Sequence, residues 1–291
     1  MKNGNTDRAI GSGRKRKTSD SADRLIVLQV KRNRFTTAEE IREATGLENV
    51  SNKTIRRRIF ECSEFASYWA VRKPFISENN RKKRVQWCLE HRDWTVEQWR
   101  KVIWTDESPY VLRFNCSQRV WRSANERYDK KCILASVKHD QKLMVWGCFT
   151  AHGVGDLHRI VGIMDKHVYH SVLVHHFRPS ANRLFPNGDY IFQQDNDPKH
   201  TAIINKDYVK NKNIPTMRWP AQSPDLNPIE NLWSILDRRL KDRKVNTLDE
   251  LFKTLQDGWN KLDTDLLTRL CDSMPHRIEA VLHSKGMPTK Y

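Results

Sequence analysis

The hydrophobic pattern of this chain changes at Lys101, and the change restricts the folds that it can adopt. Residues 21–62 have apolar residues at helix spacing, whereas strand-like runs mixed with helical patterns follow Lys101. The strand-like runs are 102–105, 110–114, 143–149, 157–161 and 190–194. The longest helical patterns cover 166–184 and 229–240. This order predicts an α/β domain with a mixed sheet, preceded by a small all-α domain.

Four segments are expected from pattern and composition. Residues 1–20 form a basic, flexible arm, because they contain almost no apolar residue. Residues 21–62 form a helix-turn-helix domain. Residues 63–100 form a linker, whose tryptophans we expect to pack against the α/β domain rather than to stack on bases. Residues 101–291 form the α/β domain.

Capping signals support the helix-turn-helix prediction. One helix opens at Thr37, with Glu40 three residues later as a capping box, and it ends at Gly46. The next helix opens at Ser51 and has Ile55 on its apolar face. The short turn between these helices is typical of a helix-turn-helix unit.

The chain carries a formal net charge of +17, concentrated toward its N-terminal end. Residues 1–84 contain 21 Lys and Arg against 10 Asp and Glu. Such an excess favours a polyanionic partner, usually nucleic acid. The six cysteines form no CxxC pair, the N-terminus is polar, and no apolar run is as long as a membrane span. These features predict reduced thiols in a soluble, intracellular protein and argue against a secreted or membrane protein.

Three acidic residues stand where an active site could form. Asp106 and Asp195 each directly follow a strand-like run, and Glu230 lies beside the apolar stripe of the helix predicted over 229–240. Because sites in open α/β sheets gather at the carboxyl ends of strands, both aspartates are placed at a candidate site. The glutamate can lean over the same edge of the sheet from its helix.

Clustered carboxylates repel one another, and divalent cations remove this repulsion. Mg²⁺, which Mn²⁺ can replace, prefers oxygen ligands and is often shared with substrate phosphates. Two such ions about 3.5–4 Å apart can hold the attacking and leaving oxygens of a displacement at phosphorus. The acids therefore predict metal-dependent phosphodiester chemistry. Glu107, Asp197 and Asp225 lie in the same segments, and periodicity alone does not choose among the acids.

Four local sequences resemble the transposases of the Tc1-like branch of the Tc1/mariner superfamily. They are WTDES at 104–108, VWGCF at 145–149, QQDNDPKHT at 193–201 and WPAQSPDLNPIENLW at 219–233. The resemblance extends from about Gly11 to the C-terminus. It implies an RNase H-like catalytic domain whose catalytic and metal-binding residues are Asp106, Asp195 and Glu230.

The spacing of the acids is part of this resemblance. From Asp195 to Glu230 there are 34 intervening residues, which marks the Tc1-like branch, and Asp197 would break that spacing. The resemblance further implies Mg²⁺ dependence, cleavage at the ends of an inverted-repeat element, and cut-and-paste insertion at TA dinucleotides. Double-stranded DNA is the implied partner, with a homodimer in the DNA complex and a nuclear location.

The third predicted helix would be the recognition helix. Asn52, Lys53 and Arg56 would point outward near its N-terminal half, which enters a major groove, and Arg57 follows them in the basic run. Asn and Arg side chains can each contact a base through two hydrogen bonds, whereas Lys more often meets phosphate.

A basic run lies upstream of the helices. Arg14, Lys15, Arg16 and Lys17 resemble the GRPR-type minor-groove arm of the family, with Lys15 where the family has proline. Loss of this proline should weaken readout of minor-groove shape while keeping the attraction to phosphate. The same run also fits a nuclear-localisation signal.

One departure from the family favours an alternative. Family members carry two helix-turn-helix units, and only about ten residues precede the arm here, so the first unit is expected to be absent. The alternative function is a truncated or co-opted, transposase-derived DNA-binding protein without transposition activity. Retention of three mutually repelling acids disfavours it, and the helix-turn-helix unit disfavours a nuclease that acts on RNA–DNA hybrids.

Overall fold

The computed structural model of the chain describes residues 16–63, 65–68, 75–112, 141–240, 243 and 245–291. The chain divides into two units, Met1–Arg72 and Lys73–Tyr291, which we describe separately. Among the described helices, none combines the length and the hydrophobicity needed to cross a membrane.

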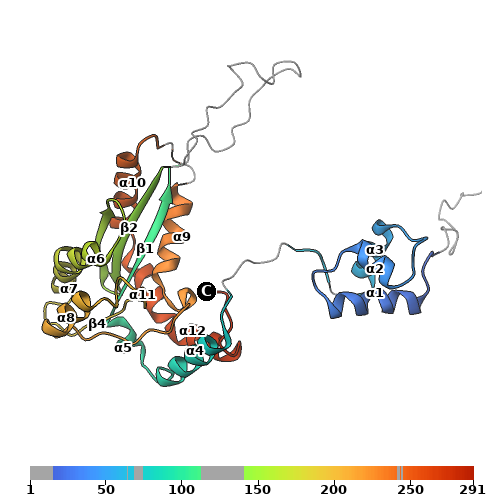
Figure 1. Ribbon diagram of the computed structural model, residues 1–291, viewed down its shortest axis with the longest axis horizontal. Helices are drawn as coiled ribbons and strands as arrows, with labels where there is room; N and C mark the ends of the chain where they lie inside the picture. Colours follow the sequence, from blue (N-terminus) through green and yellow to red (C-terminus); the bar gives the residue numbers. More distant parts are fainter. Residues whose placement is uncertain (1–15, 64, 69–74, 113–140, 241–242, 244) are drawn as a thin grey trace, which may run out of the picture. The chain divides into compact units, whose positions relative to one another are not determined.

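The described residues of the first unit form three helices, as predicted, and they are labelled in Figure 1. They are α1 (Asp20–Arg32), α2 (Ala38–Ala44) and α3 (Asn52–Cys62). The capping box is present, because the Thr37 hydroxyl accepts from the Glu40 amide and the Glu40 carboxylate accepts from the Thr37 amide at 2.7 Å. Ser51 caps α3 in the same way. The core of the unit consists of Ile26, Ile41, Val50 and Ile55.

The second unit is built on a mixed sheet, as predicted. Its strands are β1 (Val102–Val111), β2 (Lys142–Thr150), β3 (Gly153–Ile160) and β4 (Ile191–Phe192). The order is β3-β2-β1-β4, with β1, β2 and β3 antiparallel and β4 parallel to β1. The prediction of two separate strands at 102–105 and 110–114 is wrong, because one strand, β1, extends from the first run into the second. The polar residues between them belong to β1, because pairing with β2 continues through Glu107 and Pro109.

Helices cover both faces of the sheet (Figure 1). One face carries α6 (Lys166–Val172), a π-helical turn (Leu173–Phe177), α7 (Arg178–Leu184) and α8 (Ile203–Asn211). The other carries α9 (Ile229–Leu240), α10 (Leu248–Asn260), α11 (Thr264–Asp272) and α12 (Met274–His283). Side chains alternate along β1, so Trp104 packs into the core on the α9 side and Ile103 into the core on the α6 side.

Two further helices lie within the segment predicted as a linker, 63–100. They are α4 (Glu78–Glu90), which packs against α12, and α5 (Val96–Arg100), which packs against α11. The tryptophans of this segment pack together with Trp104 and Trp219, with ring centroids 4.7–6.0 Å apart. The prediction that they serve packing is therefore confirmed. The boundaries at residues 20, 62 and 100 stay predictions.

Candidate active site

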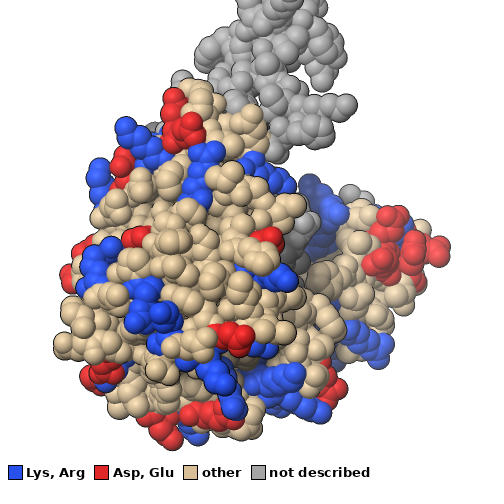
Figure 2. Space-filling model, turned by 60° about the vertical axis from the view of Figure 1, so that its left-hand side comes forward, with Lys and Arg blue, Asp and Glu red and all other residues tan. Residues whose placement is uncertain are grey.

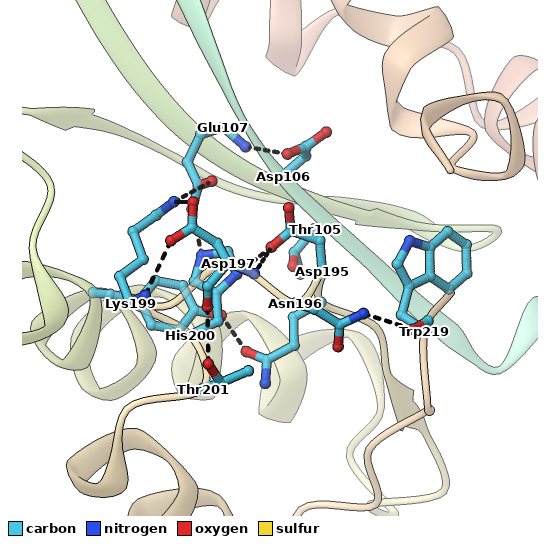
Figure 3. Close-up of polar contacts among 12 residues, drawn as sticks. Thr105, Asp106, Glu107, Asp195, Asn196, Asp197, Lys199, His200, Thr201 and Trp219 are labelled. Carbon is cyan, nitrogen blue, oxygen red and sulfur yellow. Dashed lines mark hydrogen bonds and ion pairs between the residues drawn. The ribbon is translucent and has the colours of Figure 1, made fainter. Parts of the chain in front are cut away.

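The strand register brings Asp106 and Asp195 to the same edge of the sheet. The pairs Val102–Ile191 and Ile103–Phe192 join β1 to β4 in parallel. Both pairs have the same sequence separation as the two aspartates, so the aspartates stand at corresponding positions just beyond the paired residues. Beside them, the Thr105 hydroxyl donates to the Gln193 carbonyl at 2.8 Å. Figure 3 shows both aspartates in this region.

Helix α9 brings Glu230 over this edge. The Asn227 side-chain amide donates to the Thr105 carbonyl at 3.3 Å, which ties the start of α9 to the residue before Asp106. On β2, Gly147 pairs with Asp106. A Cβ atom at Gly147 would lie 2.8 Å from the Trp233 ring, so only glycine lets α9 approach this closely. The VWGCF motif thus has a packing function.

The three predicted carboxylates share one electrostatic environment. Burial, and then the charges of Glu230, Glu107 and Asp195, raise the pKa of Asp106 well above its ordinary value. Burial also raises the pKa of Glu230, against a side-chain hydrogen bond with Asp106 that lowers it. The structure therefore places Asp106 and Glu230 close together and disfavours ionisation of both, whereas the pKa of Asp195 is lowered. In the described part of the chain, no group of three or more His, Cys, Asp or Glu side chains is placed so that it could hold a metal ion.

His200 links Asp195 to Glu107, a contact that the sequence did not predict. Its Nδ1 lies 2.6 Å from Asp195 Oδ1 as an ion pair rather than a well-aligned hydrogen bond, and its Nε2 lies 3.0 Å from Glu107 Oε1. Burial would lower the pKa of His200, but hydrogen bonds and charges of the two acids raise it to about 9. Burial would raise the pKa of Asp195, but His200, the Asp197 amide and Lys199 lower it.

The structure separates the alternative acids from the triad. Glu107 points toward Lys199 and His200, whereas Asp106 points away from them (Figure 3). Asp197 pairs with Lys199 at 2.7 Å. Asp225 is buried and accepts two hydrogen bonds of 2.8 Å from Arg84. Each of these three acids has a cationic partner, as Asp195 also has in His200. The spacing of the family motif separately excludes Asp197.

The predicted DNA-contacting residues fall into three groups. Lys53, Arg56 and Arg57 are exposed on α3, and Asn52 is half-buried at its start. Lys17 is exposed, whereas Arg16 pairs with Asp23 at 2.6 Å. The predictions for Arg14 and Lys15 lie outside the described residues.

Arg58, next in the basic run of α3, is different from its neighbours. It is buried, donates to the Thr18 hydroxyl at 2.7 Å and lies 3.6 Å from Asp23, so it serves the fold of the first unit. On the face of the molecule in Figure 2, Lys and Arg side chains are widely spread and acidic side chains lie among them.

Comparisons with known protein families match both units. A family model described as "Transposase", with a helix-turn-helix, matches residues 23–93, and one described as "DDE superfamily endonuclease" matches residues 101–252. The Tc1 transposase of Caenorhabditis elegans is 38% identical over 275 residues, covering 92% of this chain and 100% of the relative. The Tcb1 transposase of Caenorhabditis briggsae is 39% identical over 244 residues, covering 83% and 88%.

Solved structures show the same fold. The structure named "Mos1 transposase paired-end complex with left transposon end" matches with a TM-score of 0.80 at 16% identity, covering 98% of this chain and 84% of that chain. The crystal structure of the catalytic domain of Mos1 mariner transposase matches with a TM-score of 0.60 at 17% identity, covering 76% and 100%. The fold is therefore a helix-turn-helix domain followed by an RNase H-like domain, as predicted.

Proposed function

This chain belongs to the Tc1-like transposases, enzymes of the DDE type, and we propose that it cuts DNA at the ends of an inverted-repeat element and joins those ends to TA target sites. This proposal is supported by the register of β1 and β4, which puts Asp106 and Asp195 at corresponding positions, and by the charge interaction of Asp106 with Glu230. The retained acids and the DNA-binding unit in one chain favour cut-and-paste transposition over DNA binding alone.

The three acids fit a site for divalent cations. Their donors are hard carboxylate oxygens, which Mg²⁺ and Mn²⁺ prefer. Burial and then the repulsion of neighbouring acids raise the pKa of Asp106, and a bound cation would offset that repulsion. Asp106, Asp195 and Glu230 would hold the ions, which when bound supply charge stabilisation for the attacking and leaving oxygens at phosphorus.

The other residues of the site hold these acids in place. Strand β1 fixes Asp106, because Thr105 is hydrogen-bonded both to Gln193 and to Asn227. Helix α9 fixes Glu230 over the same edge. Preformed placement of charged groups lowers the cost of reorganisation when a charged phosphodiester binds.

DNA recognition belongs to the first unit in this proposal. The exposed N-terminal half of α3, with Lys53 and Arg56, enters a major groove of the terminal inverted repeat, and the basic arm follows the adjacent minor groove. A homodimer holds two element ends, and the basic run also directs the chain to the nucleus.

We expect the purified protein to nick DNA that carries the terminal inverted repeats of its element, only when Mg²⁺ or Mn²⁺ is present. The measurement is gel analysis of end-labelled duplexes, with Ca²⁺ and with a metal chelator as controls. Cleavage that proceeds equally with the chelator would contradict the assignment of the acids. Products joined at positions other than TA would contradict only the target preference.

We expect Arg56→Ala to weaken binding to the terminal repeat by about 1–3 kcal/mol, because a base-reading arginine contributes this much. Arg32→Ala, at an exposed position of α1, is the matched control and should leave sequence preference unchanged. Fluorescence anisotropy over a series of salt concentrations measures both. Binding that does not weaken with added salt would contradict neutralisation of phosphates by this unit.

A further inference from the structure

His200 is enclosed between two carboxylates on opposite sides of its ring. Its side chain is 4% exposed, Nδ1 faces Asp195 and Nε2 faces Glu107. The ring also packs against Tyr169, with centroids 4.0 Å apart, and the Tyr169 hydroxyl donates to Gln194. Because both ring nitrogens face carboxylate oxygens, and one face of the ring is covered, the imidazole has a single orientation in which both contacts are made.

We propose that His200 is a positioning residue that orients the Asp195 carboxylate toward the metal site, with Glu107 holding its other ring nitrogen. This proposal rests on the proposed function, because it assumes that Asp195 binds a divalent ion. The acidic residues then have two different functions. Asp106, Asp195 and Glu230 bind metal, whereas Glu107 holds His200, which orients Asp195.

The first part of the proposal concerns Asp195. Its side chain is 52% exposed, and such a carboxylate would otherwise rotate freely. Both described contacts are to Oδ1, from His200 Nδ1 at 2.6 Å and from the Asp197 amide at 3.0 Å. Fixing one oxygen in this way sets the direction of the other. Partners that orient a metal-binding side chain typically contribute a factor of about 10–100 in metal affinity or activity.

The second part concerns Glu107, which directly follows Asp106 in β1. Its side chain is 12% exposed, with Oε1 on His200 and Oε2 3.5 Å from the Lys199 ammonium group. Strand alternation places it on the side of the sheet opposite to Asp106, and two cationic partners hold it there. Its charge reaches Asp106 nevertheless, since it is among the causes that raise the pKa of Asp106.

Two amide substitutions separate the two contacts of the ring. In His200→Asn the side-chain nitrogen can occupy a position near that of Nδ1, so the contact with Asp195 is kept. In His200→Gln it can reach the position of Nε2, so the contact with Glu107 is kept instead. The variants have the same chemistry and similar burial, and each is the control for the other. Glu107→Gln, which preserves an acceptor for Nε2, is a third, conservative variant.

The readout is Mn²⁺ binding to the full chain, measured by electron paramagnetic resonance and calorimetry, beside thermal unfolding and cleavage. We expect His200→Gln to lower Mn²⁺ affinity about 10–100-fold. We expect His200→Asn and Glu107→Gln to remain within about threefold of the parent chain. A purely structural role would lower thermal stability in both histidine variants without separating their metal affinities.

Three results would overturn the proposal. The first is equal loss of affinity in both histidine variants, and the second is tighter Mn²⁺ binding by His200→Gln, which would make the histidine a competitor of the metal. The third is a loss in Glu107→Gln as large as that in His200→Gln, which would make Glu107 a ligand. Failure of the parent chain to bind Mn²⁺ would instead contradict the proposed function.

Discussion

Replacing Asp106 by asparagine is expected to abolish DNA cleavage while making the metal-free protein more stable. Loss of cleavage should exceed about 100-fold, because even a residue that only orients a metal ligand contributes 10–100-fold. DNA binding should be unchanged, since the DNA-binding residues proposed here lie in the first unit. Asp195→Asn and Glu230→Gln are expected to abolish cleavage in the same way.

The gain in stability follows from the sign of the pKa shift. The pKa of Asp106 is raised in the folded chain, by burial first and by neighbouring acids next. Its ionised form therefore opposes folding at neutral pH, and the amide removes that cost. The gain should disappear below about pH 4, where an unfolded-state aspartate is also protonated.

Thermal unfolding with and without Mg²⁺ checks this prediction. Mg²⁺ should stabilise the parent chain and have little effect on Asp106→Asn, because an ion that binds only the folded state raises its stability. An asparagine variant that cleaves like the parent chain would remove Asp106 from the active site. Loss of DNA binding together with cleavage would show that the substitution disturbs the structure beyond the active site.

Replacing Arg84 by methionine is expected to destabilise the second unit by about 3–5 kcal/mol, because it leaves a buried carboxylate without its partner. Arg84 is completely buried, donates two hydrogen bonds of 2.8 Å to Asp225, and donates to the Gly286 carbonyl at 3.1 Å. Asp225 also accepts from the Thr289 amide at 2.9 Å. For a unit of this size, the loss corresponds to a fall of about 6–20 °C in Tm.

Arg100→Met is the matched control for this prediction. Arg100 makes the same two-bond contact with Asp272, at 2.8 and 2.7 Å, but its side chain is 38% exposed. An exposed ion pair contributes up to about 1 kcal/mol, so the control should unfold within a few degrees of the parent chain. Equal destabilisation in the two variants would contradict the importance of burial.

The pH dependence gives a second check. Burial would raise the pKa of Asp225, but its contacts with Arg84 and Thr289 lower it. Its contribution to stability is therefore complete above the unfolded-state value near 4 and is lost as the pH falls through the lower, folded-state value. The difference in stability between the parent chain and Arg84→Met should shrink over that acidic range.

The Arg84–Asp225 contact also bears on the active site. Asp225 lies five residues before Glu230, and Arg277 donates to both the Asp225 carbonyl at 2.8 Å and the Asn231 side chain at 2.6 Å. Two buried arginines thus hold the loop from which α9 starts. The SPDLNPIE motif therefore combines one structural acid with one catalytic candidate.

Local patterns determined much of this protein. The bounds of α9, the capping box at Thr37 and the start of α3 after Ser51 agree with the sequence prediction, because helix periodicity and capping depend on residues within one or two turns. The position of Asp195 just after a strand was also predictable, whereas Asp106, expected after a strand, lies within β1 because pairing with β2 continues past it. Choosing the triad from the six candidate acids needed the family motifs, because the neighbouring sequence of an acid does not show whether it binds metal or forms an ion pair.

Only the tertiary structure decided which partner each of these acids has. Asp106 and Glu107 are neighbours in the chain, yet strand alternation sends one toward Glu230 and the other toward His200, 93 residues away. Asp225 is neutralised by an arginine 141 residues away. Such partners are set by the packing of α4, β1 and α9 around one core, and no pattern within a short window of sequence contains that information.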